Sequence, residues 1–339
     1  MKKIIKRTLI VINILAIIFF LAVAIGLNLA YNSVFKKYEL SDYDTTRYYT
    51  YSEIDIDKYP REVLKIKSGD NSINAYLYNS QSTQGLIVVS PGHSDFSDIK
   101  LPEIIDFVDN GWMVLCYDYT GCYGSEGDNM VGYTQTVYDL SNVLNYIDCN
   151  NKFENLPIFL FGHSLGAYAS CAVLNESNSN ITAVVACSGF DNPAEQWAYS
   201  VKRSTGFFGR ILEPFAKIQM KVKFGEEANL SAIDGINSGN LPILLINGTV
   251  DEFYGEETSI YTHKDKITNP NCSIQVMNEV NHNGHYDYFL TDEALEYQKL
   301  VSSGGVDDVD KFLYLQHDQK VMKDINDFFS SFLSSQTPT

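Results

Sequence analysis

Short, uninterrupted apolar segments recur along this chain from residue 84 onward, and stretches of helical character separate them. The clearest segments are QGLIVVSPG, WMVLCYDYTG, LPIFLFG, ITAVVACSG, LPILLING and CSIQVMNEV. A run of this kind, without polar alternation, suits a strand that is buried on both faces. Strands and helices that alternate in this order form a mostly parallel sheet with helices on both faces. We therefore expect an α/β fold, preceded by a hairpin formed by REVLKIKSG and INAYLYNS.

The N-terminal end of the chain has a different character. Lys2, Lys3, Lys6 and Arg7 precede an uncharged run of 23 residues, Thr8–Ala30. As a helix this run would reach roughly 34 Å, which is enough to cross the core of a bilayer. Cations on the N-terminal side favour a cytoplasmic N-terminus. We expect residues 1–30 to be a transmembrane anchor, with the rest of the chain outside the cytoplasm.

A cleaved signal peptide is the alternative for the same residues. Ala22-Val23-Ala24 has the small side chains of a cleavage site. The apolar region of a signal peptide spans about 7–15 residues, whereas this run is longer and continues past Ala24. The retained anchor is therefore the preferred interpretation, and secretion after cleavage stays open.

The remainder divides into a linking segment and one large domain. Residues 31–58 are polar and rich in tyrosine, so we expect a stalk there and a folded domain over residues 59–339. Residues 191–238 interrupt the alternation because they are too long for one crossover helix. We interpret them as a helical lid, with a pair of core helices as the alternative. Their large apolar residues are Trp197, Phe207, Phe208, Ile211, Leu212, Phe215, Ile218 and Met220.

Charge and cysteine content exclude several classes of partner. The net charge is −17, and because the first thirty residues carry +4, the remainder carries −21. Such a surface repels nucleic acid and anionic lipid headgroups, so we expect membrane contact only through the N-terminal helix. The six cysteines form no CxxC pair or metal-ligand cluster. We expect buried free thiols, no metal and no cofactor, while the oligomeric state is open.

The chemistry is concentrated in Gly162-His163-Ser164-Leu165-Gly166, a G-x-S-x-G pentapeptide. It follows the apolar segment LPIFLF and precedes AYASCAVL, which is the strand–turn–helix setting of a nucleophile elbow. In so tight a turn, side chains two residues before and after the serine would collide with backbone, and glycines avoid the collision. The turn exposes Oγ at the edge of the sheet, near the positive end of a helix. We expect Ser164 to be a nucleophile.

Three further stretches accompany the pentapeptide: SPGHSDFSD (90–98), DYTGCYGSEG (118–127) and ILLINGTVDEF (243–253). With these motifs, residues 60–335 resemble the α/β-hydrolase superfamily, and within it the lidded lipase/esterase and serine-peptidase-like hydrolases. The resemblance implies a triad in the chain order serine, acid, histidine. Segment 118–127 departs from the family pattern because Thr120 replaces an arginine. This segment would shape the wall of the site, and Cys122 within it lacks the paired base that a second nucleophile would need.

The resemblance also implies an oxyanion hole after the strand QGLIVVS. Family members often carry a His-Gly-x turn here, whereas this chain has Pro91 at the usual histidine position. By this match the backbone N–H groups of His93 and Leu165 would bind the oxyanion. The departure shifts the register, so Ser94 is an alternative to His93. His93 itself precedes the nucleophile and lies on the wrong loop to be the general base of this family.

The acid and the base remain to be placed. Asp251, in Gly-Thr-x-Asp after a buried strand, matches the triad acid, which would accept the histidine Nδ1–H. There are two alternatives: Asp251 only caps a helix, or Glu252 is the triad acid in its place. His282 and His285 both follow in VNHNGHYDYF. We prefer His285, because family members often present this histidine after glycine, and His282 stays open. Their H-x-x-H spacing has no accompanying carboxylate or cysteine cluster, so we expect no metal there.

Together these features predict a serine hydrolase that acts through a Ser-His-Asp triad and an acyl-enzyme, without a cofactor. The aromatic insert suggests a substrate with an apolar acyl or aryl group, so a small-molecule or monoacyl lipid ester comes first. An amide or short peptide is the second candidate. A catalytically inactive binding protein on the same scaffold is the third.

Overall fold

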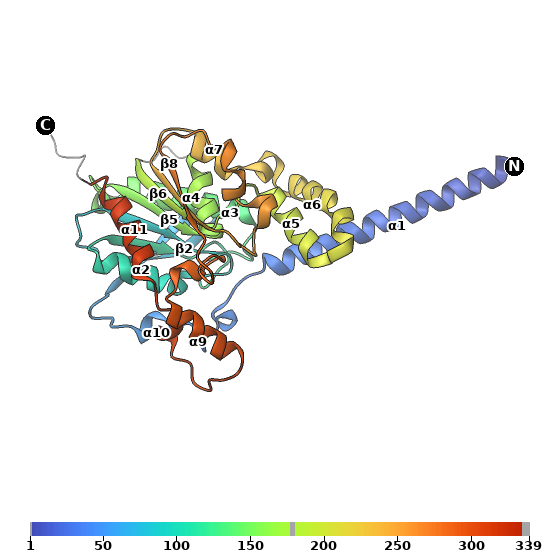
Figure 1. Cartoon of the computed structure of the whole chain (residues 1–339). Coiled ribbons are helices and arrows are strands. Elements are labelled where there is room, and N and C mark those ends of the chain that lie inside the picture. The colour runs from blue at the N-terminus through green and yellow to red at the C-terminus, as the bar shows by residue number, and fades with distance from the viewer. Residues whose placement is uncertain (1, 177–179, 334–339) are drawn as a thin grey trace.

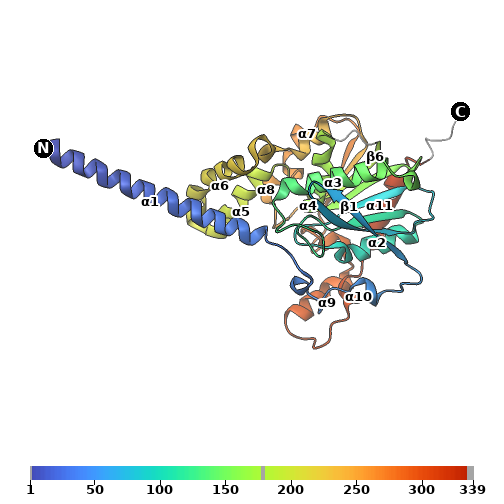
Figure 2. The same cartoon turned by 180° about the vertical axis from the view of Figure 1, so that it is seen from behind.

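The computed structural model describes residues 2–176 and 180–333. In it a central sheet is enclosed by helices, and one long helix projects away from this body (Figures 1 and 2). The described strands are β1 (Arg61–Ser68), β2 (Asn71–Tyr78), β3 (Leu86–Ser90), β4 (Met113–Tyr117), β5 (Ile158–His163), β6 (Ile181–Cys187), β7 (Ile243–Gly248) and β8 (Cys272–Met277). The described α-helices are α1 (Lys2–Val34), α2 (Leu101–Asp109), α3 (Tyr133–Asp148), α4 (Leu165–Ala172), α5 (Pro193–Thr205), α6 (Gly209–Phe224), α7 (Ala232–Asn237), α8 (Gly255–Thr258), α9 (Asp292–Ser302), α10 (Lys311–Tyr314) and α11 (Gln319–Ser330).

The sheet has the strand order β1-β2-β4-β3-β5-β6-β7-β8. Strand β2 pairs antiparallel with both β1 and β4, and the pairs from β4 through β3, β5, β6 and β7 to β8 are parallel. The mostly parallel α/β sheet expected from the sequence is confirmed. The parallel strands end at one edge of the sheet, and the loops that carry the candidate residues leave from that edge.

Two apolar cores cover the two faces of the sheet. Because successive side chains of a strand point to opposite faces, neighbouring residues Val88 and Val89 of β3 belong to different cores. One core includes helices α3, α4 and α7, and the other includes α2 and α11. All residues of β3, β4 and β5 are buried, which explains why these strands read as continuous apolar runs.

The insert between β6 and β7 is helical, as expected, but its parts have different positions. Helices α5 and α6 pack against each other, and α6 also contacts α1, alongside the half of α1 nearer the body (Figures 1 and 2). Helix α7 instead packs against α4 and contributes Ile233 and Ile236 to the core. The segment over residues 191–238 is therefore a helical pair followed by one ordinary core helix.

Residues 31–58 do not form a free stalk. Helix α1 continues past the expected end at residue 30 to Val34, and Tyr31 and Phe35 are buried in the core next to α3. Farther on, Tyr43 and Tyr49 are also buried. The tyrosines make the segment look polar in the sequence, but a tyrosine ring buries apolar surface while its hydroxyl keeps a polar partner. The segment lies against the domain along its length.

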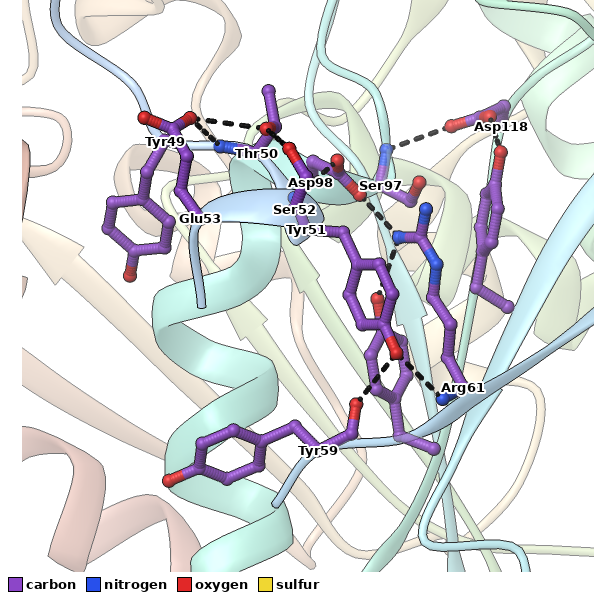
Figure 3. A network of polar contacts seen from close by, with 12 residues as sticks. Tyr49, Thr50, Tyr51, Ser52, Glu53, Tyr59, Arg61, Ser97, Asp98 and Asp118 are labelled. Atoms are coloured by element: carbon purple, nitrogen blue, oxygen red, sulfur yellow. Dashed lines mark hydrogen bonds and ion pairs between the residues drawn. The ribbon is translucent and has the colours of Figure 1, made fainter. Parts of the chain in front are cut away.

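A network of polar contacts fixes the end of this segment (Figure 3). The Asp98 carboxylate accepts a hydrogen bond from the Tyr51 backbone N–H at 2.8 Å and pairs with the Arg61 guanidinium at 2.6 Å. The guanidinium also lies over the Tyr51 ring, 3.8 Å from its centroid. The neighbouring Ser97 N–H donates to Asp118 at 2.8 Å. The chain after α1 is thereby tied to the loop that follows β3.

One helix among the described residues is long and apolar enough to cross a membrane, and it covers Lys3–Val34. Its N-terminal part is exposed, whereas Leu27 is buried against the rest of the protein.

Candidate active site

Ser164 lies on a sharp turn between β5 and α4. Its backbone has φ 60° and ψ −120°, a strained conformation for a residue with a side chain. A Cβ at Gly162 would lie 2.2 Å from the carbonyl oxygen of Gly166. A Cβ at Gly166 would lie 2.0 Å from the carbonyl oxygen of Ser90. Both glycines are therefore required by close backbone approach, and the turn presents the Ser164 hydroxyl at the carboxyl edge of the sheet.

Asp251 and His285 meet from two separate loops. His285 Nδ1 and Asp251 Oδ2 are 2.8 Å apart, and the two side chains are 10% and 4% exposed. The other carboxylate oxygen of Asp251 accepts hydrogen bonds from the backbone N–H groups of Phe253 and Tyr254. Because the carboxylate can only accept, it favours the tautomer with a proton on Nδ1 and leaves Nε2 as the basic nitrogen.

His282 has a different partner. Its Nε2 lies 2.9 Å from Asp292 Oδ1, and its Nδ1 lies 3.2 Å from the Asp287 carbonyl oxygen. The His282 side chain is 9% exposed, whereas that of Asp292 is 91% exposed, so the acid of this pair lies in solvent. Of the two histidines left open by the sequence, the structure therefore brings His285 to the acid. The acceptor of the His285 Nδ1–H is Asp251 and not the neighbouring Glu252.

A tyrosine that could not be predicted from the sequence contacts the candidate nucleophile. The hydroxyls of Tyr254 and Ser164 are 2.6 Å apart, and the Tyr254 ring meets the His285 ring edge-on, with centroids 5.1 Å apart. Burial raises the pKa of Tyr254, so it remains a neutral hydroxyl. Among the described residues, Tyr254 is the hydrogen-bond partner of Ser164 Oγ. The available signal was its position three residues after Asp251, on the same turn.

His163 is a second residue of the site without a predicted role. Its Nε2 lies 3.0 Å from the carbonyl oxygen of His285. Burial lowers the pKa of His163 well below its usual value, so the ring is neutral, and the proton on Nε2 is donated to that carbonyl. His163 therefore joins the turn of Ser164 to the loop of His285. Its place beside the serine in the pentapeptide was the only signal in the sequence.

The loop after β3 lies next to the serine. A Cβ at Gly92 would be 3.7 Å from the Ser164 Cβ, and Gly92, His93 and Ser94 line the same cavity as Ser164. The His93 ring packs edge-on against the Phe35 ring, with centroids 5.5 Å apart. Leu165 begins α4, so its backbone N–H has no acceptor within the helix.

The cavity above Ser164 has a volume of about 790 Å³. This size lies in the range of sites for small molecules. Tyr254 and His285 line it together with Ser164. Helix α5 contributes Gln196, Tyr199, Ser200 and Arg203, and α1 contributes Val34 at its last turn. The insert and the end of the N-terminal helix thus form walls of the site.

The thiols and the candidate metal ligands can also be placed. Four cysteines are buried and free, but Cys149 is exposed and Cys272 is half-buried, so the expectation of buried thiols was wrong for these two. Within residues 2–176 and 180–333, no group of three His, Cys, Asp or Glu side chains has the arrangement of a metal site. His282 and His285 each bind a different carboxylate.

Residues 81–232 match the family model described as serine aminopeptidase, S33. The matched region contains Ser164 and the loop after β3, and it ends before Asp251. No curated protein sequence matches the chain significantly.

Several solved structures have a similar fold. An esterase from Pyrococcus furiosus superposes with a TM-score of 0.57 at 15% identity, over 83% of this chain and 95% of that one. Est1E from Butyrivibrio proteoclasticus, with ferulic acid bound, gives 0.53 at 14% identity, over 80% of this chain and 99% of that one. An acylaminoacyl peptidase from Pyrococcus horikoshii gives 0.54 at 13% identity, over 83% of this chain but 43% of that one. At these identities the likeness shows the fold.

Proposed function

We propose that this chain is a membrane-anchored serine hydrolase of the α/β-hydrolase superfamily that cleaves carboxylic esters, because residues 81–232 match a serine aminopeptidase family model and the fold is similar to that of a solved esterase. The observation that carries the proposal is the pairing of Asp251 with His285 beside the cavity that exposes Ser164. A hydroxyl on a strained turn, a buried histidine and a buried carboxylate are the three groups that acyl transfer by a serine requires.

The proposed reaction begins when His285 Nε2 takes the proton from Ser164 Oγ as this oxygen bonds to the ester carbonyl carbon. The backbone N–H groups of His93 and Leu165 stabilise the negative oxygen of the tetrahedral intermediate. The bond to the alcohol then breaks, and His285 returns the proton to the leaving oxygen. Water attacks the resulting acyl-enzyme with His285 again as base, which releases the acid and restores Ser164. Asp251 stabilises the imidazolium in both halves.

Tyr254 has a part in the resting state of this proposal. Its hydroxyl lies 2.6 Å from Ser164 Oγ, and either oxygen can be the donor. When Ser164 donates to Tyr254, the serine hydroxyl must exchange this partner for His285 before attack. The exchange costs about one hydrogen bond, roughly 1 kcal/mol, which is small beside the barrier of acyl transfer.

An ester is the first substrate class, and a peptide or amide is the second. The apolar side chains of Val34, Ile99 and Phe253, which line the cavity, and the similarity to esterases support an ester with an apolar acyl or aryl group. The match to a serine aminopeptidase family and the likeness to an acylaminoacyl peptidase favour the second class. A panel of esters of increasing acyl length, run beside peptide arylamides, separates the two.

We place the catalytic domain outside the cytoplasm, held by a retained α1. Cleavage after Ala24 would remove Phe19 and Phe20, whose rings contact the Phe215 ring of α6 with centroids 6.3 and 5.7 Å away. The contact supports a retained anchor over a signal peptide. The mass of the mature protein, measured by mass spectrometry, distinguishes a retained anchor from a cleaved signal peptide, because cleavage would remove about 24 residues.

Serine-directed labelling tests the enzyme assignment. We expect a fluorophosphonate to label the wild type and to fail on Ser164→Ala, with p-nitrophenyl ester turnover lost in parallel. Labelling that persists unchanged in Ser164→Ala would remove Ser164 from the mechanism. A wild type that neither labels nor turns over esters or arylamides would instead be an inactive scaffold.

A further inference from the structure

The insert carries an exposed apolar stripe that the fold does not need. Phe207 and Phe208 precede α6, and Ile211, Ile218 and Val222 lie on it; their exposed fractions are 88%, 64%, 50%, 60% and 80%. Ile211, Ile218 and Val222 are spaced by seven and four residues, so they share one face of α6, and Phe207 and Phe208 stand just before its first turn. We call these five residues the apolar stripe.

The other face of α6 supplies the packing. Gly209, Ala216 and Met220 are buried, and a Cβ at Gly209 would lie 2.4 Å from the carbonyl oxygen of Lys202 in α5. Helices α5 and α6 are therefore in backbone contact through small residues. Because this face already holds the helical pair together, the apolar stripe is free to contact something outside the chain.

The apolar stripe is continuous with the apolar surface of α1. Phe215, next to the stripe on α6, contacts Phe19 and Phe20. On α5, Trp197 meets Tyr31 edge-on with ring centroids 5.1 Å apart. Both views of the molecule show α6 alongside the half of α1 nearer the body (Figures 1 and 2).

The position of these contacts along α1 sets their depth in a bilayer. From Arg7 to Phe20 the helix rises by about 20 Å, and the apolar core of a membrane is about 30 Å thick. With the cations of the first turns at the cytoplasmic surface, Phe20 lies in the outer half of the membrane. Phe215, which touches Phe20, must then lie at the level of the outer leaflet as well.

The charge of the helical pair differs from that of the whole chain. Residues 193–224 contain six basic side chains and two acidic ones, although the chain has a net charge of −17. The basic residues are Lys202, Arg203, Arg210, Lys217, Lys221 and Lys223. In the part of the chain that the structure describes, the exposed Arg210 and Lys221 form no ion pair. The expected repulsion of anionic headgroups therefore does not apply to this surface.

We propose that the apolar stripe lies in the outer leaflet of the membrane that α1 crosses, with the basic side chains at the headgroups. An amphipathic helix with phenylalanines on one face and lysine and arginine beside it is suited to that position. Helix α5 and Val34 line the cavity, so the site is held next to the lipid surface. The substrate is then an ester drawn from the leaflet, which extends the function proposed above and rests on it.

The test uses the full chain in vesicles of phosphatidylcholine and phosphatidylglycerol. The variant combines Phe207→Asp, Phe208→Asp and Val222→Asp, all at exposed positions. The matched control combines Ile56→Asp, Val63→Asp and Leu300→Asp, which adds the same charge at exposed apolar positions outside the insert. Each protein receives a short soluble p-nitrophenyl ester and a long-chain p-nitrophenyl ester dissolved in the vesicles.

We expect turnover of the vesicle ester to fall by at least about tenfold in the stripe variant, while turnover of the soluble ester stays within about twofold. The control should keep both rates. Equal loss in the control, or no loss in the stripe variant, contradicts the proposal. If the wild type fails on both esters, the proposed function itself is wrong, and the second measurement still tests the stripe.

The second measurement reports contact with lipid directly. In Phe208→Trp, brominated lipids should strongly quench the fluorescence of the new tryptophan. The native Trp112 and Trp197 are buried and should add little to the quenching. Quenching no greater than in the wild type means that the apolar stripe is not in the leaflet. A dimer of the full chain that the stripe variant abolishes would identify a second copy as the occupant and overturn the proposal.

Discussion

Replacement of Asp251 by asparagine tests which histidine is the general base, because His285 pairs with Asp251 whereas His282 pairs with Asp292. The variant keeps the size of the side chain, and its remaining oxygen can still accept from the backbone N–H groups of Phe253 and Tyr254. The turn should therefore stay folded. What changes is the negative charge 2.8 Å from His285 Nδ1, which in the proposed mechanism stabilises the imidazolium formed during attack.

The size of the effect follows from this distance. Two opposite unit charges 2.8 Å apart attract by about 6 kcal/mol at an effective dielectric constant of about 20. Because about 1.4 kcal/mol corresponds to tenfold in rate, the loss of this charge lowers kcat by about 10⁴-fold. The amide also favours the wrong tautomer of His285, which acts in the same direction.

The assay is steady-state hydrolysis of a p-nitrophenyl ester, with thermal unfolding to show that the variant is folded. Asp292→Asn is the matched control, since Asp292 pairs with His282 at 2.9 Å but its side chain is 91% exposed. An ion pair whose acid is exposed to solvent contributes little, so we expect less than about threefold change in kcat. A large loss in Asp292→Asn together with a small one in Asp251→Asn would show that His282 is the base and that our reasoning from geometry is wrong.

Three further predictions concern the turn, the tyrosine and a buried acid. Gly166→Ala should lower the free energy of unfolding by about 3 kcal/mol, because its Cβ would meet the Ser90 carbonyl oxygen, whereas Gly239→Ala, with open space around it, should change little; equal melting temperatures contradict this. Tyr254→Phe should speed fluorophosphonate labelling by up to about tenfold, since Ser164 Oγ loses its resting partner, and abolished labelling would assign the tyrosine a direct role in attack. Burial raises the pKa of Asp118 from its ordinary 3.8 to about 7, so the folded chain holds a proton that the unfolded chain releases, and stability falls as the pH rises from about 4 to 7. Asp118→Asn should remove this contribution, about 4 kcal/mol across that window, and denaturant titrations with parallel pH profiles for both proteins would refute it.

The sheet and the turn of Ser164 could be predicted because each depends on local sequence. Strands buried on both faces require continuous apolar runs, and the elbow requires glycine at 162 and 166, whatever the rest of the chain does. The same is true of the loop after β7, where Asp251 follows the strand directly.

The choice between His282 and His285 could not be made from spacing alone. Both lie on one loop, and their partners come from different elements: Asp251 from the loop after β7 and Asp292 from the start of α9. The contact of Tyr254 with Ser164 could not be predicted for the same reason, because it joins two loops that are 90 residues apart.

The composition of residues 31–58 suggested a stalk and did not reveal that the segment packs against the domain. Its tyrosines lower the mean hydropathy, but Tyr31 and Tyr43 are buried, and Tyr51 takes part in the network around Arg61. The contact of α1 with α6 also could not be predicted from the sequence, since an apolar helix shows no periodicity that marks which side packs against protein.

The most direct measurement of the central claim is the pre-steady-state burst of the wild-type chain with a p-nitrophenyl ester, followed by mass spectrometry of the quenched protein. The account predicts a burst of close to one p-nitrophenol per chain and an acyl group located on Ser164. An acyl group on any other side chain, or steady turnover without an acyl-protein, would contradict it.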